Sequence, residues 1–575
     1  MSQKDKISKL KTKKSPWAIY YHNDAFIHSN GKLMGRHAAG SAFLRAIAKE
    51  NYTEVGALTR NKVDQQNFIN LFKSFLTNNQ KVDLKLFPWN LPYLSEEFGG
   101  IFIGDPSLGN YSVLRSNFDH SQYSIVGITH TTMSKAIMDF IGDIIVKPVK
   151  EWDALICTSK CVKNSVDTLL SEYKNIIGDR LKIGSVSLPE LPIIPLGVHP
   201  EDFNFNNEEK LKLREKMGIN PEDIALTFVG RLSFHAKAHH FPMYRALQEV
   251  AKNYGGQKKI HLIQIGWFAN DYIANIMQSE AKLICPDVIC HFVDGLDQNN
   301  KNLTLSSSDI FISLTDNFQE TFGLTPLEAM AAGIPVVVTD WDGYKDTVRN
   351  NKDGFTIPTI SLEKGSGIDL IYNYYSDIMN YDQYISFASQ RVAVDIDKCI
   401  KRIIELIEQP ELRKKMGESG KKRAESNFSW KTIMNSYSNL RDNLNQKRNS
   451  INLKENTKSY MEIYDPMNLF NSYPSEVLNE NHFFRTKISN TISEDHYLFT
   501  SKSIQIVQDK NKLDSDYLEL SPNIEIVNSI INILLKENLS LKDIYKKLSF
   551  SKKMINKTII IMLKFDIIAK IKAIN

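Results

Sequence analysis

The sequence predicts an α/β protein with two Rossmann-like, doubly wound domains of parallel sheet and a small, mostly helical C-terminal domain. Short apolar runs recur along the chain up to Thr339, and helix-like stretches separate most of them. Because an alternation of strands and helices builds a parallel sheet, each series of runs predicts one such domain. Beyond residue 450 the composition shifts toward Asn, Lys and Ser, which predicts a separate unit.

The first sheet is predicted over residues 15–200. Its apolar runs are residues 17–21, 55–59, 82–87, 101–104, 123–128, 153–158 and 192–197. Helix-like stretches at 38–50 and 132–141 lie between them. Residues 1–14 precede this domain as a basic segment with six lysines and no apolar run behind it, so we expect a disordered N-terminus and not a secretory signal.

The second sheet is predicted over residues 201–393, where a polar, helix-prone stretch at 206–219 comes first. Its β-rich runs are residues 225–230, 260–266, 287–293, 309–314 and 334–339. Runs this short and this apolar suit strands buried on both faces. Residues 394–447 have a helical apolar period, and we expect them to brace the two domains.

Residues 455–575 predict an accessory domain of winged-helix type. Short strands are expected within 498–519, and a last apolar run covers 567–571. Three helices are expected at 524–538, 540–548 and 551–566. Ser540 and Ser551 precede the second and third of these helices as N-caps.

Composition narrows the class of protein. The 575 residues are 42% hydrophobic and 24% charged, as in soluble globular proteins. The net charge of +5 comes from 71 basic and 66 acidic residues, an imbalance too small to indicate nucleic-acid binding. Five scattered cysteines fit a reducing compartment, and no apolar run approaches the roughly 20 residues that span a bilayer. We therefore expect a cytoplasmic protein, with peripheral contact to the inner membrane face as an option.

The segment 306–355 carries the strongest candidate chemistry. A buried strand ends at residue 314, a polar loop follows, and a helix is expected to begin near Pro326. Ligands of open α/β sheets bind at this carboxyl edge, and free N–H groups at a helix N-terminus favour a diphosphate. Gly323 would let the backbone approach such a group closely.

Glu320 and Glu328 stand in this segment with seven residues between them, together with the strings FGLTPLE, AMAAGIPVV and DGF. These residues resemble the signature of retaining, nucleotide-sugar-dependent glycosyltransferases of the bacterial family-4 group, which have the GT-B fold of two Rossmann-like domains facing a crevice. The resemblance covers about 15–445. It implies that Glu320 contacts hydroxyls of the donor sugar and that Glu328 holds the nucleotide ribose. Glu328 also fits a second interpretation, a capping box with Thr325 as N-cap.

Arg231 and Lys237 follow a predicted strand at the same sheet edge. Two cations there would neutralise a diphosphate and stabilise the charge that grows on the leaving group. The resemblance implies this role for both residues. Two solvated surface charges are the alternative.

The N-terminal half offers weaker candidates. The resemblance implies that Gly35 approaches the donor phosphates, with Arg36 or His37 close by, although a helix start that happens to contain Gly explains the same residues. It also implies that His130 is the active-site histidine near the reacting carbon, whereas a lone His is usually structural.

The resemblance completes a donor-binding set. Val293 and Gly295 are expected beside the nucleotide base, and Phe322, Gly323, Leu324 and Thr325 are expected around the phosphates. The cysteine pairs 157/161 and 285/290 lack a second ligand pair at zinc spacing. We predict no metal and no cofactor, because Arg231 and Lys237 can do a metal's electrostatic work.

The tail between Lys536 and Asn575 has ten lysines and three acidic residues. A nucleic acid, an anionic membrane or an acidic partner protein could each meet this charge. We favour a solvated helical face and do not expect nucleic acid, because no arginines or aromatic ladders accompany the lysines.

The leading hypothesis is a glycosyltransferase of hexosyltransferase type that moves a sugar, with retention, from a nucleoside diphosphate sugar to an acceptor. UDP-sugars are favoured as donors because the resembled family most often uses them. The acceptor could be a saccharide, a lipid-linked sugar or a protein. The alternatives are a sugar-nucleotide epimerase or a phosphorylase on the same fold, and a non-catalytic sugar-nucleotide-binding module that acts through its basic C-terminal domain.

Overall fold

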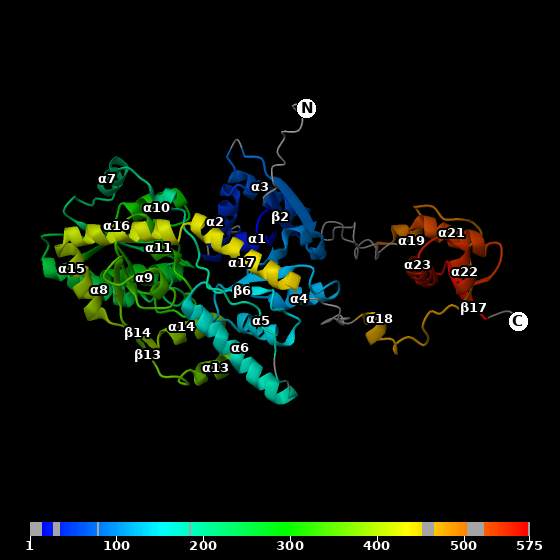
Figure 1. Ribbon diagram of the computed structural model, residues 1–575. Helices are drawn as coiled ribbons and strands as arrows, with labels where there is room; N and C mark the ends of the chain where they lie inside the picture. Colours follow the sequence, from blue (N-terminus) through cyan, green and yellow to red (C-terminus); the bar gives the residue numbers. More distant parts are fainter. Residues whose placement is uncertain are drawn as a thin grey trace, which may run out of the picture. The chain divides into compact units, whose positions relative to one another are not determined.

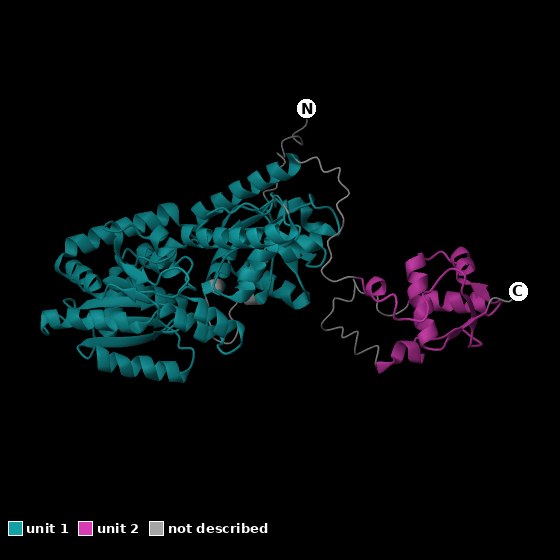
Figure 2. Ribbon diagram, turned by 90° about the horizontal axis from the view of Figure 1, so that it is seen from below, with its two compact units in different colours: residues 1–460 teal, residues 461–575 magenta. Residues whose placement is uncertain are grey.

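The computed structural model describes residues 14–26, 35–77, 80–182, 184, 186–450, 465–502 and 523–572. The chain divides into two compact units, Met1–Tyr460 and Met461–Asn575 (Figure 2). The first unit contains both predicted sheets, here called the first lobe and the second lobe.

Six parallel strands in the order β3-β2-β1-β4-β5-β6 form the sheet of the first lobe. This lobe is drawn in blue to cyan in Figure 1. They are β1 (Ala18–Tyr20), β2 (Glu54–Thr59), β3 (Asp83–Pro88), β4 (Gly100–Phe102), β5 (Ser124–Ile128) and β6 (Ala154–Ile156). The helices are α1 (Asn23–Phe26), α2 (Gly35–Lys49), α3 (Lys62–Ser74), η1 (Pro92–Phe98), α4 (Leu108–Ser116), α5 (Lys135–Val146) and α6 (Lys160–Leu181). Six of the seven predicted runs are strands.

The prediction of a strand at 192–197 is wrong. The segment pairs with the sheet only through isolated bridges, Ala154 with Glu190 and Cys157 with Ile193. Pro192 and Pro195 lack the N–H group that a continued strand would donate, so an extended connection forms in its place.

The second lobe repeats the design with the order β12-β11-β10-β7-β8-β9, again all parallel. Its strands are β7 (Ile224–Val229), β8 (Ile260–Gly266), β9 (Val288–Asp294), β10 (Ile310–Ser313), β11 (Val336–Thr339) and β12 (Gly354–Ile357). Its helices are η2 (Pro200–Phe203), α7 (Asn207–Lys216), α8 (His240–Tyr254), α9 (Asp271–Ile284), α10 (Gln298–Ser306), α11 (Leu324–Ala331) and α12 (Tyr344–Thr347). Two such lobes in one compact unit give the GT-B architecture expected from the sequence.

Three features of the second lobe lie beyond the predicted strands. β12 completes the sheet, and a Cβ at Gly354 would lie 1.9 Å from the Val336 carbonyl oxygen, so only glycine lets β12 approach β11 here. An antiparallel pair, β13 (Thr359–Ser361) and β14 (Val392–Val394), follows. Between its strands lie α13 (Ile368–Tyr375) and α14 (Tyr381–Ser389).

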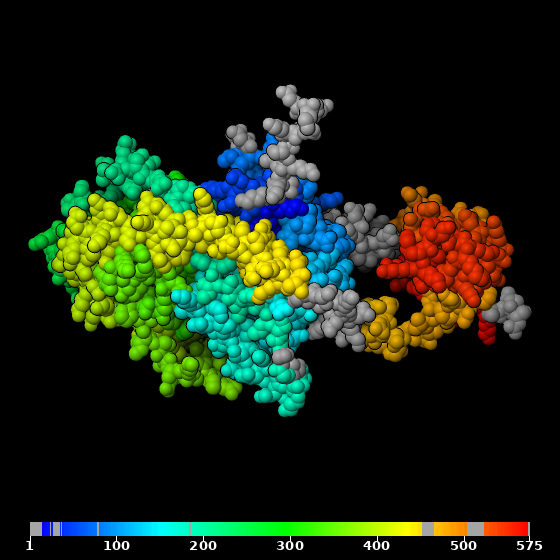
Figure 3. Space-filling view, in the orientation of Figure 1, coloured from blue at the N-terminus to red at the C-terminus, as the bar shows by residue number. Residues whose placement is uncertain are grey.

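The final helices of the first unit are α15 (Ile396–Glu408), α16 (Pro410–Asn427) and α17 (Trp430–Ser450), as their apolar period predicts. Of these, α15 packs on α8 and α16 on α11, so both belong to the second lobe, and α17 packs on α2 of the first lobe. Figure 3 shows α16 and α17, in yellow, lying across both lobes. The bracing role predicted for 394–447 therefore falls mainly to α17.

The chain crosses between the lobes twice, and the two crossings lie side by side. Val198 on the outward path donates its N–H to the Phe428 carbonyl at 2.8 Å, and Trp430 on the return path donates to Val198 at 3.0 Å. Beyond the crossing, Tyr437 of α17 packs against Phe43 and Phe102 of the first lobe, with ring centroids 5.3 and 5.9 Å away. This aromatic packing anchors the returning chain.

Among the described residues of the second unit, three antiparallel strands in the order β16-β15-β17 occur together with five short or medium helices. The elements are α18 (Pro466–Leu469), β15 (Phe483–Thr486), α19 (Tyr497–Thr500), α21 (Ile524–Leu534), β16 (Leu539–Ser540), α22 (Leu541–Lys547), α23 (Lys552–Lys564) and β17 (Ile568–Ile571). Ser540 and Ser551 cap α22 and α23, as predicted.

Of the strands predicted within 498–519, the first residues belong to α19, and residues 503–519 lie outside the described residues. Within the part of the chain that the structure describes, no helix is long and apolar enough to cross a membrane.

Candidate functional site

The candidate site lies at the carboxyl edge of the second sheet, where β7, β8, β9 and β10 end. Their glycines let the backbones lie very close together. A Cβ at Gly266 would come within 1.9 Å of the Gly230 carbonyl oxygen, and one at Gly295 within 2.9 Å of the Gly266 Cα. The loops that carry Arg231 and the predicted base-contacting residues Val293 and Gly295 are therefore adjacent.

Lys237 and Glu320 form an ion pair between the loop after β7 and the loop after β10. Their side chains are 21% and 11% exposed, so the pair is largely removed from water. The structure thus joins two residues that the sequence analysis proposed for separate parts of one donor.

Pairing shifts the pKa of each residue in the direction that favours its charged form. Burial by itself lowers the pKa of Lys237, but the Glu320 carboxylate and Tyr344 outweigh it, and the net shift is upward. Burial raises the pKa of Glu320, but Lys237 and backbone N–H groups of Phe322 and Thr321 bring it below its ordinary value. Both groups are therefore charged across the neutral range.

Hydrogen bonds fix the two loops to each other. Thr315 donates its hydroxyl to the Lys237 carbonyl at 2.8 Å, and the Asn317 amide donates to the His235 carbonyl at 3.0 Å. The Gln319 amide donates to the Ala236 carbonyl at 3.2 Å. Lys237 and Glu320 thus stand on a preorganised frame.

The N-terminus of α11 is built around Gly323. This residue is the N-cap and has φ of +89°, a left-handed conformation that favours glycine. A Cβ there would lie 2.1 Å from the Tyr344 ring, which is fully buried and has its hydroxyl 3.0 Å from that of Ser313. The backbone N–H groups at this helix start face the same edge as Lys237.

The capping interpretation of Thr325 and Glu328 is wrong. The helix begins at Leu324, so Thr325 lies inside its first turn and is not the N-cap. The Phe322 side chain is buried, and Pro326 lies in the helix and not at its start.

Glu328 bonds a residue that the sequence analysis did not single out. Lys301 of α10 donates its ammonium to Glu328 Oε1 at 2.8 Å, and Lys301 is 8% exposed. Glu328 Oε2 is buried and accepts no hydrogen bond from the described residues. One carboxylate oxygen is held in place, and the other is a buried acceptor with no donor among the described residues.

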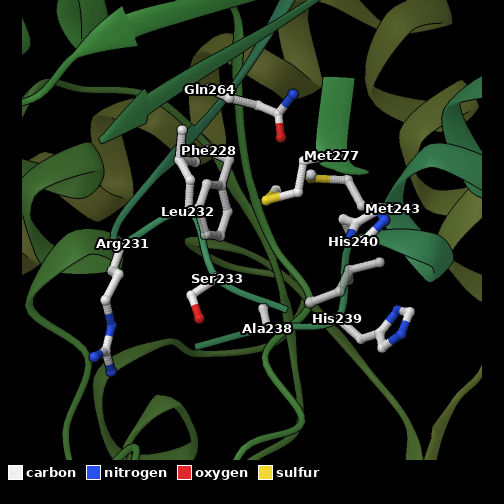
Figure 4. A pocket seen from close by; sticks show the side chains of 11 residues that line it. Phe228, Arg231, Leu232, Ser233, Ala238, His239, His240, Met243, Gln264 and Met277 are labelled. Atoms are coloured by element: carbon white, nitrogen blue, oxygen red, sulfur yellow. The ribbon is translucent and has the colours of Figure 1, made fainter. Parts of the chain in front are cut away.

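Arg231 lies at the rim of the same site. Its guanidinium donates to the Ala236 carbonyl at 3.0 Å, and burial lowers its pKa while Asp382 and Tyr381 raise it. In Figure 4 its guanidinium points away from Met243 and Met277, which line a narrow apolar cavity with Phe228, Leu232 and Leu314. Arg231 also lines this cavity, which lies between α8 and the sheet.

The first lobe contributes His130, at the carboxyl end of β5. Its Nε2 lies 3.0 Å from the Gly104 carbonyl oxygen, and the ring lines an apolar recess with Phe26, Phe102 and Trp430. Nearby Met133 packs against Leu370 and Met379 from the second lobe, so this loop contacts that lobe.

Gly35 is the first residue of α2 and has open space where a Cβ would be. His37 is buried, and the rest of the predicted glycine loop, residues 29–34, lies outside the described residues. The proposed phosphate approach at Gly35 stays a prediction.

Some site residues were missed because only the folded chain brings them together. Lys301 is preceded by the polar string DQNN and carries no motif, and its position after β9 was its one signal. Tyr344 and Gln319 likewise belong to no pattern recognised in the sequence.

Metal ligands do not cluster in the described residues, where no group of three His, Cys, Asp or Glu side chains could hold an ion. The cysteines are free thiols, and the Sγ atoms of Cys285 and Cys290 lie 3.9 Å apart.

Comparison with known proteins places this site in a recognised domain. Residues 209–364 match the family described as "Glycosyl transferases group 1". The second lobe therefore contains a glycosyl transferases group 1 domain, which holds Arg231, Lys237, Glu320 and Glu328.

Curated relatives include spore coat protein SA of Bacillus subtilis (strain 168), 24% identical over 239 residues, or 41% of this chain and 52% of that protein. The alpha-monoglucosyldiacylglycerol synthase of Streptococcus pneumoniae (strain ATCC BAA-255 / R6) is 27% identical over 188 residues, or 32% and 37% of the two chains. The chain spans about half the length, or less, of the first curated relatives it matches.

Among solved structures, Anabaena Alr3699/HepE in complex with UDP-glucose is similar with a TM-score of 0.48 and 14% identity. The similarity covers 74% of this chain and 100% of that chain.

Proposed function

We propose that the protein is a retaining glycosyltransferase of hexosyltransferase type. It takes a sugar from a nucleoside diphosphate sugar bound at the carboxyl edge of the second sheet and transfers it to an acceptor held by the first lobe. The observation that carries the proposal is the Lys237–Glu320 pair beside the Gly323-capped start of α11. An ion pair that is largely removed from water thus stands three residues before a helix start, where backbone N–H groups lack partners within the helix.

In this proposal the nucleoside lies along β9 and α11. Glu328 Oε2, which has no donor among the described residues, accepts a ribose hydroxyl, and Lys301 holds the carboxylate in place. Val293 and Gly295 lie at the end of β9 beside the base.

The diphosphate lies against Arg231, Lys237 and the start of α11. As the bond between the anomeric carbon and the phosphate oxygen breaks, negative charge grows on the leaving diphosphate. The two cations and the helix N-terminus stabilise that charge, which lowers the barrier. These groups make a metal unnecessary, and we expect a chelator to leave the rate unchanged.

Glu320 accepts hydrogen bonds from hydroxyls of the donor sugar and thereby orients the anomeric carbon. The acceptor oxygen bonds to that carbon on the face the diphosphate leaves, and the departing phosphate takes the acceptor's proton. No protein nucleophile is required. His130 stands on the opposite lobe as a contact to the sugar near the reacting carbon.

A thermal-shift screen with UDP-, GDP-, ADP- and TDP-sugars identifies the donor, with UDP-sugars tested first. Nucleoside diphosphate release in the presence of candidate acceptors then tests transfer, and the anomeric proton coupling of the product tests retention. Release that rises with acceptor supports the proposal, whereas epimerised donor without acceptor would replace it. If all four donors leave the melting temperature unchanged, the proposed site is wrong.

A further inference from the structure

The two lobes touch beside the candidate site through the corner between β6 and α6. The Thr158 hydroxyl donates to the Thr321 carbonyl at 3.4 Å, one residue from Glu320. The Ser159 hydroxyl donates to Asp342 Oδ1 at 3.1 Å, and the Lys160 backbone N–H donates to Asp346 Oδ2 at 2.7 Å. Three consecutive residues of the first lobe thus bond three residues of the second.

The corner is the N-terminus of α6, a helix of 22 residues. The first N–H groups of a helix lack partners within it, and the helix dipole favours negative charge there. Ser159 satisfies one of them as N-cap, accepting from Val162 at 3.2 Å. Asp346 satisfies another from the opposite lobe, so a carboxylate of the second lobe completes the cap of a helix in the first.

The Asp342 and Asp346 carboxylates are both held in place by contacts within the second lobe. Arg423 of α16 donates to the backbone carbonyls of Asp346 and Thr347, each at 2.9 Å. The neighbouring Trp341 donates its indole N–H to the Asn317 carbonyl at 3.1 Å, and Asp342 has φ of +37°, which Asp tolerates better than most residues. The second lobe therefore presents the two carboxylates in a fixed geometry.

The loop that carries these carboxylates is packed against the loop that carries Glu320. A Cβ at Gly343 would lie 2.3 Å from the Phe322 Cα, so the two backbones are in direct contact. Burial raises the pKa of Asp342 to about 7, and repulsion by the nearby Glu320 carboxylate contributes to this shift. Direct contacts of the loop 342–346 thus connect the start of α6 with the segment that begins at Glu320.

We propose that Asp342 and Asp346 are positioning residues. They bind the N-terminus of α6, an arrangement here called the clamp, and they thereby keep the two lobes in contact and fix the position of Glu320 in the site. The clamp itself stands on the contacts above, and its consequence for turnover rests on the proposed function. It deepens that function by assigning the closed arrangement of the crevice to two named carboxylates.

The test compares the full-length protein with Asp346→Ala, Asp346→Asn and the control Glu363→Ala, an exposed acidic residue of the same lobe. Hydrogen–deuterium exchange is measured for peptides covering 158–166 on the first lobe and 317–324 on the second. UDP-glucose hydrolysis is measured with its kcat and KM, and the melting temperature shows that each variant folds.

We expect Asp346→Ala to speed exchange in both peptides about tenfold and to lower kcat about tenfold. Asp346→Asn keeps the size of the side chain and an acceptor oxygen but loses the charge, so it should restore most of the protection, which a role of the negative charge alone would not predict. The control Glu363→Ala should match the parent in both exchange rate and kcat. Unchanged exchange in the 317–324 peptide, or faster exchange with unchanged kcat, overturns the proposal.

A parent protein that hydrolyses no UDP-glucose speaks against the proposed donor and function, and the exchange measurements still decide whether the clamp exists.

Discussion

Lys237 and Glu320 pair across the edge of the second sheet although 83 positions separate them in the chain. Each stands on a loop that follows a buried parallel strand, and β7 and β10 are neighbours in the sheet. The doubly wound order, and not closeness in sequence, therefore makes the pair.

The ion pair predicts that substitutions at Lys237 and Glu320 have strongly coupled effects on the free energy of unfolding. Lys237→Met leaves a largely buried carboxylate without its cation, and Glu320→Gln leaves the ammonium without its anion, so each should destabilise the fold by about 1–3 kcal/mol. The double variant removes both charges, and its loss should be clearly smaller than the sum. Urea denaturation measures all three, and strictly additive losses would contradict a direct pair.

Glu328 and Lys301 are predicted to act together on the nucleotide. Glu328→Gln weakens the acceptor, and Lys301→Met frees the carboxylate to rotate, so both should weaken UDP binding by about tenfold, the loss of roughly one charge-assisted hydrogen bond. Isothermal titration with UDP measures the affinity. Lys252→Met, at an exposed position of α8, serves as the control and should bind as the parent does. Parental affinity in both site variants would remove Glu328 from the nucleotide site.

Gly323→Ala tests the tight start of α11. The new Cβ must adopt φ of +89° and meets the Tyr344 ring at 2.1 Å, so we expect a loss of more than about 2 kcal/mol. Gly333 is a matched control, with φ of +80° but its nearest atom, the Lys421 Cδ, at 3.8 Å. Gly333→Ala should cost only about 1 kcal/mol. Equal losses on chemical denaturation would mean that backbone strain, and not Tyr344, requires glycine at 323.

Asp316 predicts a pH-dependent term in stability. It is 4% exposed, and burial raises its pKa from 3.8 to about 7, against a hydrogen bond from the His239 N–H that lowers it. Between these values the folded chain binds more protons than the unfolded chain. The stabilising contribution of the protonated Asp316 side chain is therefore complete below pH about 4 and is lost as the pH rises to 7.

Asp316→Asn keeps a neutral side chain and removes this dependence. The free energy of unfolding of the parent, measured against that of the variant, should fall as the pH rises from 4 to 7. A difference that stays constant over this range would show that Asp316 is charged in the folded protein.

The sequence predicted the sheets well because their strands are fully buried. Runs such as 260–266 are β-rich, apolar and bounded by turn residues, and that run matches β8 residue for residue. The run at 192–197 is also apolar, but its two prolines exclude it from the ladder of hydrogen bonds. β12 was missed because it begins at a glycine whose role is a close backbone approach and contains only two large apolar residues, Phe355 and Ile357.

The site could be predicted where its residues lie close together in the sequence. Gly323, Glu320 and Glu328 share one loop and helix, and the motif placed them together. Lys301 and the clamp at Asp342 and Asp346 depend on contacts between separate elements, for which no spacing rule exists. The α11 N-cap was assigned to Thr325 from the capping-box pattern, whereas Gly323, which packs against the buried Tyr344 ring, is the N-cap.

The most direct test of the account is the rate of nucleoside diphosphate release from the sugar nucleotide that gives the largest thermal shift. We expect Glu320→Gln and Lys237→Ala each to lower that rate by at least two orders of magnitude, while Glu363→Ala releases it at the parental rate. Parental rates in both site variants, with their folds intact, would contradict the claim that this pair acts on the donor.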